Sequence, residues 1–142
     1  MIEISGTLEG GKELSRRFNS IPLDLDKLER PLAEIGAELM IAVDANFSSR
    51  GSLFGDSWEK RKDNKAHPLL EKTGVMRAAF DKDLGPGYVK IYNPTEYFKY
   101  HQSAAPRSSN LPRRVMLKVD QIRKVFIIKT FQRHMHKAVT GK

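Results

Sequence analysis

Cysteine is absent from this sequence of 142 residues. Disulfide bridges and thiolate metal sites are therefore excluded, so packing and assembly must supply the stability. No run approaches the roughly 20 apolar residues that span a bilayer. The first residues, Met1 to Ile4, also lack the basic start and apolar stretch of a secretory signal. We expect a protein that is made in the cytoplasm and has no membrane partner.

Acidic residues are scarce in the C-terminal third. Residues 99–142 contain eleven lysines and arginines against one acid, Asp120, whereas residues 1–98 contain fourteen against sixteen. A block of positive charge attracts nucleic acid or an acidic protein surface, although it can also be a solvated helix face. The residues expected to make such contacts are Lys118, Arg123, Lys124, Lys129, Arg133 and Lys137.

Hydrophobic residues make up 39% of the chain and charged residues 30%, as in folded globular proteins, and the length fits a single domain over residues 1–142. From Asp24 to Phe47, apolar residues recur every three or four positions, which predicts a long helix. Asp24 is the expected N-cap, and Pro31 places the start of the helix close to Arg30, because proline is tolerated in the first turn only.

The remaining pattern predicts shorter elements. We expect strands at residues 1–7, 88–92 and 115–119, a short helix over 69–80 that contains Gly74, and a helical turn or two over 95–101 with Asn93 as N-cap. A final helix over 121–139 starts at the N-cap Asp120 and has as its apolar positions Ile122, Val125, Phe126, Ile128, Met135 and Val139. The order predicts a small α+β domain, with the long N-terminal helix and the C-terminal helix packed on a short, mostly antiparallel sheet.

Two segments have neither helical nor strand periodicity, residues 48–67 and residues 103–114, and we expect both to be long mobile loops. The first contains Phe54 and the single tryptophan, Trp58. Aromatic residues beside glycine are frequent anchors at protein interfaces, and the alternative is that both fold back onto the domain. The second loop has few apolar side chains and orders only on a partner. The interface residues expected from the two loops are Phe54, Trp58, Arg107, Arg113 and Arg114.

The residues suited to catalysis form no recognisable set. The four histidines, at positions 67, 101, 134 and 136, are scattered, as are the carboxylates. His134 and His136 would point about 200° apart on a helix and could not comfortably share a metal ion. The sequence has no nucleophile elbow, P-loop or dinucleotide fingerprint. We therefore expect a protein that is not an enzyme and has no catalytic residue, metal or cofactor.

Six short patterns occur in a characteristic order. They are a long helix that ends in Phe47, residues 54–58 with a glycine and a terminal tryptophan, residues 70–77 with Thr73-Gly74, a strand at 89–91, residues 97–102 with His101-Gln102, and residues 111–117 with Pro112 before the arginines. Over about residues 24–139 the chain resembles the phage virion morphogenesis family, the tail completion proteins of Mu-like and P2-like bacteriophages. Two positions depart from the pattern: Ser103 stands where glycine is common, and Arg113 where a small residue is usual.

The resemblance implies a non-catalytic structural protein of the virion, in the neck or the tail terminator, that acts in head-to-tail joining or tail completion. It implies a homo-oligomeric ring, with a hexamer favoured by the sixfold symmetry of tails, which contacts other phage neck or tail proteins. The basic C-terminal third could face a neighbouring copy or the DNA in the channel. The alternative is a basic DNA-binding module that contacts phosphates through the same third.

Overall fold

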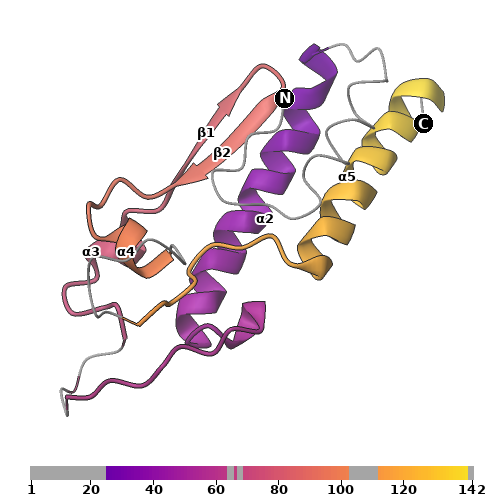
Figure 1. Cartoon of the computed structure of the whole chain (residues 1–142). Helices are drawn as coiled ribbons and strands as arrows, with labels where there is room; N and C mark the ends of the chain where they lie inside the picture. The colour runs from indigo at the N-terminus through magenta and orange to yellow at the C-terminus, as the bar shows by residue number, and fades with distance from the viewer. Residues whose placement is uncertain (1–24, 64–65, 67–68, 103–111, 141–142) are drawn as a thin grey trace. The chain divides into compact units, whose positions relative to one another are not determined.

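The computed structural model describes residues 25–63, 66, 69–102 and 112–140. It confirms the α+β class: a long N-terminal helix and a C-terminal helix contact a two-stranded antiparallel sheet (Figure 1). The strand expected at residues 1–7 and the N-cap expected at Asp24 lie outside the described residues. The elements are η1 (Leu25–Leu28), α2 (Glu29–Ser48), η2 (Ser52–Phe54), α3 (Val75–Ala78), β1 (Asp81–Gly85), β2 (Tyr88–Tyr92), α4 (Phe98–Gln102) and α5 (Gln121–Thr140).

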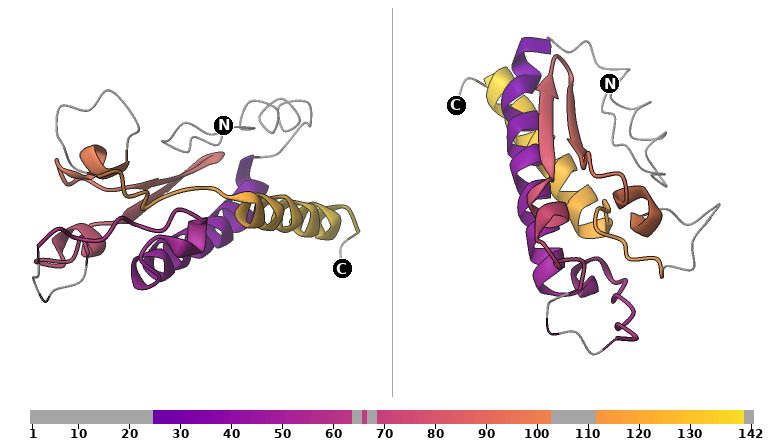
Figure 2. Two further views of the ribbon diagram at one scale, coloured as in Figure 1. Left: turned by 60° about the horizontal axis from the view of Figure 1, so that its bottom comes forward. Right: turned by 90° about the vertical axis from the view of Figure 1, so that its left-hand side faces the viewer.

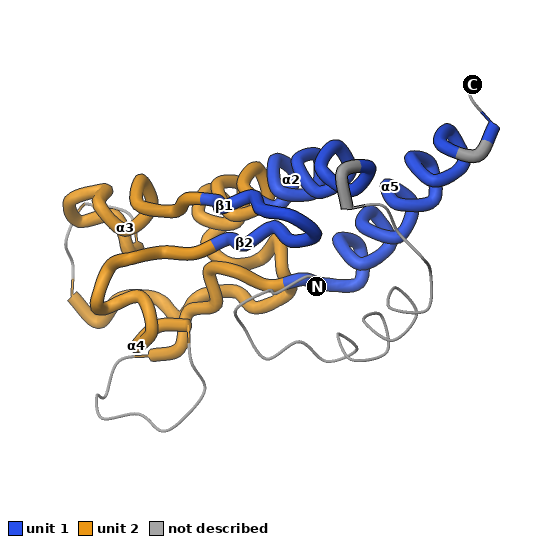
Figure 3. The backbone as a smooth tube through the Cα atoms, turned by 90° about the horizontal axis from the view of Figure 1, so that it is seen from above, with its two compact units in different colours: residues 1–39, 82–91, 119–142 blue, residues 40–81, 92–118 orange. Residues whose placement is uncertain are grey.

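The described residues form two compact units (Figure 3). Unit 1 is drawn from residues 1–39, 82–91 and 119–142, and unit 2 from residues 40–81 and 92–118. Helix α2 and both strands contribute residues to both units. Among the described residues, no helix combines the length and the apolar character that crossing a bilayer requires.

Helix α2 begins at Glu29, so Pro31 lies in its first turn, as predicted. In unit 1 the helix buries Leu32, Ile35 and Leu39 on one stripe. Gly36 brings it close to the hairpin, because a Cβ atom at this position would lie 2.9 Å from Cγ2 of Val89. The N-terminal part of α2 and the hairpin therefore lie side by side (Figures 1 and 2).

Strand β2 confirms the strand predicted at residues 88–92, and its Val89 and Ile91 are buried. Its partner β1 was not predicted, because its residues include three charged side chains and four of its five residues are exposed. The two strands are joined by Pro86 and Gly87, and a φ of +78° at Gly87 suits the third position of a type II turn. Pairing with β2 therefore forms a strand that the hydrophobic pattern does not reveal.

Helix α5 begins as predicted: the backbone N–H of Arg123 donates to Oδ1 of Asp120 at 3.0 Å, which makes Asp120 the N-cap. The predicted buried face is wrong. Three of the expected apolar positions are exposed, and Phe126 is only half-buried. The buried positions are instead Arg123, Ile127, Thr130 and Phe131.

The face of α5 was misassigned because Arg123 and Thr130 are polar residue types that a periodicity rule assigns to solvent. Arg123 is buried together with its ion-pair partner Asp120, at 2.8 Å, so its charge is compensated. The exposed apolar residues form what we call the α5 stripe: Ile122, Val125 and Ile128. Ile122 is 70% exposed.

In unit 2, the short helix predicted over 69–80 is only α3, from Val75 to Ala78. Gly74 is its N-cap and adopts a left-handed φ of +70°, so the helix is limited by the conformation that this glycine takes. Helix α4 begins at Phe98, and Asn93 does not cap it. The Asn93 side chain instead binds Thr95 and donates to the carbonyl oxygen of Met76 at 2.7 Å.

Candidate functional site

Phe54 and Trp58 lie in the core of unit 2, where they are 4% and 5% exposed. The indole N–H of Trp58 donates to the carbonyl oxygen of Val115 at 2.9 Å, and the ring meets Phe47 edge to face at 5.2 Å between centroids. Of the two interpretations of these aromatics, the structure shows the one in which they fold back onto the domain. They are therefore not exposed anchors. After the end of α2, the described part of residues 48–67 contains η2 and is otherwise irregular.

The turn that returns Trp58 to the core depends on Gly51. Its φ of +89° is left-handed, and a Cβ atom there would lie 2.3 Å from Cδ1 of Trp58 and 2.4 Å from the carbonyl oxygen of Asp56. The backbone N–H of Trp58 donates to the carbonyl oxygen of Arg50 at 2.8 Å. Glycine is thus needed at position 51 both for its conformation and for space.

Residues 115–119 do not form the predicted strand, although residues 114–117 are buried. Side chains take the place of a strand partner. The carboxamide of Gln102 accepts from the N–H groups of Met116 and Leu117 at 2.8 and 3.1 Å and donates to the carbonyl oxygen of Leu117 at 2.6 Å. Asn46 donates to the carbonyl oxygen of Val115 at 3.0 Å. Buried backbone groups need such partners, and here they come from α2 and α4.

Arg77 links α3 to α2. Its guanidinium binds the carboxylates of Glu71, at 2.6 Å, and Asp44, at 2.7 Å, and lies 5.7 Å from the ring centroid of Phe47. These carboxylates raise the pKa of Arg77, with the hydrogen bond to Glu71 as the largest cause. The role of this side chain is therefore structural within unit 2.

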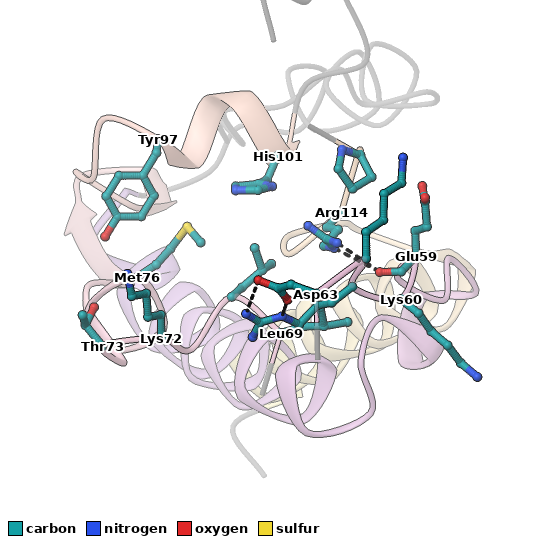
Figure 4. Close-up of a pocket in the computed structure, with 14 residues that line it drawn as sticks. Glu59, Lys60, Asp63, Leu69, Lys72, Thr73, Met76, Tyr97, His101 and Arg114 are labelled. Carbon is teal, nitrogen blue, oxygen red and sulfur yellow. Dashed lines mark hydrogen bonds and ion pairs between the residues drawn. The ribbon is translucent and has the colours of Figure 1, made fainter. Parts of the chain in front are cut away.

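Unit 2 contains an open cavity of about 750 Å³ (Figure 4). Figure 4 shows Tyr97 and Met76 on the side opposite Arg114 and Glu59. The wall combines apolar and cationic side chains, which makes the cavity the candidate binding site. Its lining is made by Glu59, Lys60, Arg61, Lys62, Asp63, Leu69, Leu70, Lys72, Thr73, Met76, Tyr97, His101, Pro112 and Arg114.

Of the two predicted interface arginines that the structure describes, Arg114 lines this cavity and Arg113 does not; Arg114 is 7% exposed. Its Nε and Nη2 donate to the backbone carbonyl oxygen of Glu59 at 3.3 and 3.1 Å. Burial lowers the pKa of Arg114; the charge of Arg61 acts in the same direction and the carboxylate of Glu59 opposes it. Arg113 is exposed and donates to the carbonyl oxygen of Gln102, while Arg107 lies outside the described residues.

The six basic residues predicted to contact an anionic partner are not gathered into one free patch. Lys118 pairs with Asp56 at 2.9 Å, Arg123 with Asp120, and Arg133 with Glu34, and Lys124 also has a partner within the chain. Lys129 and Lys137 are exposed and Lys124 is half-buried. Lys118 belongs to unit 2, whereas the other five belong to unit 1.

The histidines are also separated. His101 lies in the cavity wall, His134 is 3.0 Å from a carboxylate oxygen of Glu34, and His136 is exposed. His67 lies outside the described residues. Within residues 25–63, 66, 69–102 and 112–140, no three His, Asp or Glu side chains are placed to hold a metal ion.

Sequence reasoning did not identify the cavity, because its wall comes from four separate stretches of unit 2. The basic run at residues 60–62 was visible, but nothing in the local pattern placed it near Arg114. Comparisons of the chain with protein-family models, with curated proteins and with solved structures gave no match.

Proposed function

We propose that this protein is a non-catalytic structural subunit of a tailed bacteriophage, located in the neck or tail of the virion, that acts in head-to-tail joining or tail completion. The proposal starts from the resemblance of the six sequence patterns to the phage virion morphogenesis family. The observation that supports it further is that three of those patterns contact one another in unit 2.

Residues from three of the patterns bind one another, although they lie far apart in the sequence. Trp58 donates to Val115, Gln102 binds Met116 and Leu117, and the N–H of Arg114 donates to the carbonyl oxygen of His101 at 2.9 Å. In our proposal these residues hold the fold of unit 2 and carry out no reaction.

The α5 stripe supports a function through protein contacts. Its residues are three positions apart, so they are neighbours on one helix face. Single exposed apolar residues are ordinary, but a row of them marks an interaction surface. In our proposal the stripe contacts a neighbouring copy, and contacts of this heterologous kind close into a ring, for which a hexamer is favoured. Other neck or tail proteins then bind the ring.

The alternative of a DNA-binding module receives less support, because half of the predicted phosphate contacts are already in intramolecular ion pairs. Contact with the channel DNA remains part of the proposal only for the exposed Lys129 and Lys137. Duplex affinity that falls steeply with salt concentration would favour the alternative.

Electron microscopy of particles tests the proposal. The gene is deleted from the phage genome that carries it and complemented with the original protein, with Ile122→Lys, or with Ile41→Lys. Ile41 is the matched control, since it is 63% exposed on α2 but is flanked on its face by Glu38 and Asp44. We expect the deletion and Ile122→Lys to leave separate filled heads and loose tails, or overlong tails, and Ile41→Lys to restore complete particles. Complete particles in the deletion would refute the proposal.

A further inference from the structure

Arg114 lies in the cavity with a charge that the chain does not neutralise directly. Arg114 is 7% exposed, and the hydrogen bonds of its guanidinium go to one backbone carbonyl oxygen, that of Glu59. Among the described residues, no carboxylate lies within ion-pair distance of it. A buried cation without a carboxylate is costly, and a planar guanidinium is best satisfied by a bidentate oxyanion.

Most of the other charges in the cavity wall have the same sign as Arg114. Its wall contains five cationic side chains and two carboxylates, and one of these carboxylates, Asp63, is already held by Arg61 at 2.6 Å. Lys60, Lys62 and Lys72 are exposed and make no ion pair in the described part of the chain. A concave surface lined by one sign of charge concentrates the opposite sign, so the expected ligand is acidic.

The ligand must also offer apolar surface, because the apolar part of the cavity wall is made by Leu69, Leu70, Met76, Tyr97 and Pro112. Leu70 adopts a φ of +62°, which is unusual for a residue other than glycine and is a form of strain found at binding sites. A bare phosphate or a nucleic acid backbone would leave this wall unused. The volume of about 750 Å³ lies in the range of sites that enclose a ligand of several side chains.

We propose that this cavity binds a short acidic and apolar peptide segment of a partner protein, with a carboxylate on Arg114, the lysines around it, and an aliphatic side chain against Met76 and Leu70. The site is inferred from the cavity alone, so it is independent of the proposed role in phage assembly. Such a site can bind a partner segment that has no stable structure before it binds.

Calorimetric titration of the full chain tests the site. The probe is the blocked tetrapeptide Leu-Asp-Leu-Asp, and its matched control is Leu-Asn-Leu-Asn. We expect the first to bind about tenfold or more tightly than the second, since charge-assisted hydrogen bonds are the stronger ones. Lys72→Gln should weaken binding about threefold, and Arg114→Lys about tenfold, because lysine cannot make the bidentate contact. Lys137→Gln, an exposed lysine of unit 1, should have no effect.

Because Arg114 is buried, the Arg114→Lys variant is first checked for folding by circular dichroism. If Arg114→Lys does not fold, Lys72→Gln provides the test. The proposal is overturned if neither peptide binds at millimolar concentration, if both bind equally, or if Lys72→Gln and Lys137→Gln behave alike. It is also overturned if inorganic phosphate or a DNA duplex displaces the acidic peptide at lower concentration, which would indicate a simple anion or nucleic acid site. None of these results depends on whether phage particles assemble.

Discussion

At the scale of single residues, unit 2 is held by side chains that bind backbone groups. Gln102 satisfies three backbone groups of a buried segment that has no strand beside it, and Trp58 and Asn46 both donate to Val115. Such contacts are specific to particular residues. They explain why a few positions in an irregular segment matter more than its hydrophobic pattern suggests.

Replacing Gln102 with alanine should destabilise the protein by about 2–4 kcal/mol, because three buried backbone groups lose their partner at once. The free energy of unfolding in urea measures the effect. Gln132→Ala is the matched control: Gln132 is exposed on α5, and its replacement should change stability by less than about 0.5 kcal/mol. Equal stability of the two variants would show that Gln102 does not hold the segment.

Two glycines with similar backbone angles give a second comparison. Gly51 and Gly55 have φ values of +89° and +80°, but a Cβ atom would clash at Gly51 and meets nothing within 4 Å at Gly55. Gly55→Ala should cost about 1–2 kcal/mol for the left-handed conformation alone. Gly51→Ala adds overpacking against Trp58 and should cost about 3 kcal/mol or more in the same urea unfolding experiment. A smaller loss at position 51 than at position 55 would contradict the packing described for Trp58.

At the scale of elements, the sequence predicts the helices and strands whose ends and buried faces follow from their own residues. Helix α2 shows a regular apolar period and a proline that fixes its start, β2 alternates, and α5 has a capping aspartate. The elements that depend on distant residues were missed. Strand β1 forms because β2 pairs with it, and residues 115–119 alternate like a strand but bind side chains instead.

The buried face of α5 was missed for the same reason. Arg123 is buried with an ion-pair partner that periodicity does not show, Thr130 is buried as well, and the apolar residues of the α5 stripe are exposed. The cavity could not be predicted either, because its residues come together only when the stretches around 59–63, 69–76, 97–101 and 112–114 are folded. The basic residues that suit an acidic ligand were visible in the sequence, but the sequence did not show that they lie close to one another.

In unit 1, helices α2 and α5 are joined by Glu34, which binds Arg133 and His134. These partners lower the pKa of Glu34 from its ordinary value of 4.5, with the hydrogen bond to His134 as the largest cause. A lowered pKa in the folded state contributes stability above the unfolded pKa, and this contribution disappears as the pH falls through the folded pKa. The contact should therefore weaken in acid.

We expect the original protein to lose more stability than Glu34→Gln between about pH 5 and about pH 3, because the variant has no carboxylate to titrate there. The difference should be below about 1 kcal/mol, since the side chain of Glu34 is 39% exposed and solvent screens the pair. Urea unfolding at several pH values measures it. Glu38→Gln is the control one turn further along α2, and it should follow the original protein. Parallel pH profiles for Glu34→Gln and the original protein would show that this pair does not link the helices.

At the scale of the whole molecule, two surfaces are open to contacts with other molecules. The α5 stripe is exposed in unit 1, and the cationic cavity is open in unit 2. Both suit contacts with other proteins, and in the described residues no metal-binding cluster accompanies them. These two surfaces are the features on which we base the proposal that the protein is a component of an assembly.

Quantitative mass spectrometry of purified mature particles tests this assignment most directly. If the protein is a ring subunit of the neck or tail, its peptides should be present in intact virions at the few copies per particle that a single ring contains. The copy number should not change after stringent gradient purification, because the subunit is built into the particle. Complete absence from mature particles, or an amount that falls to zero on purification, would contradict the central claim.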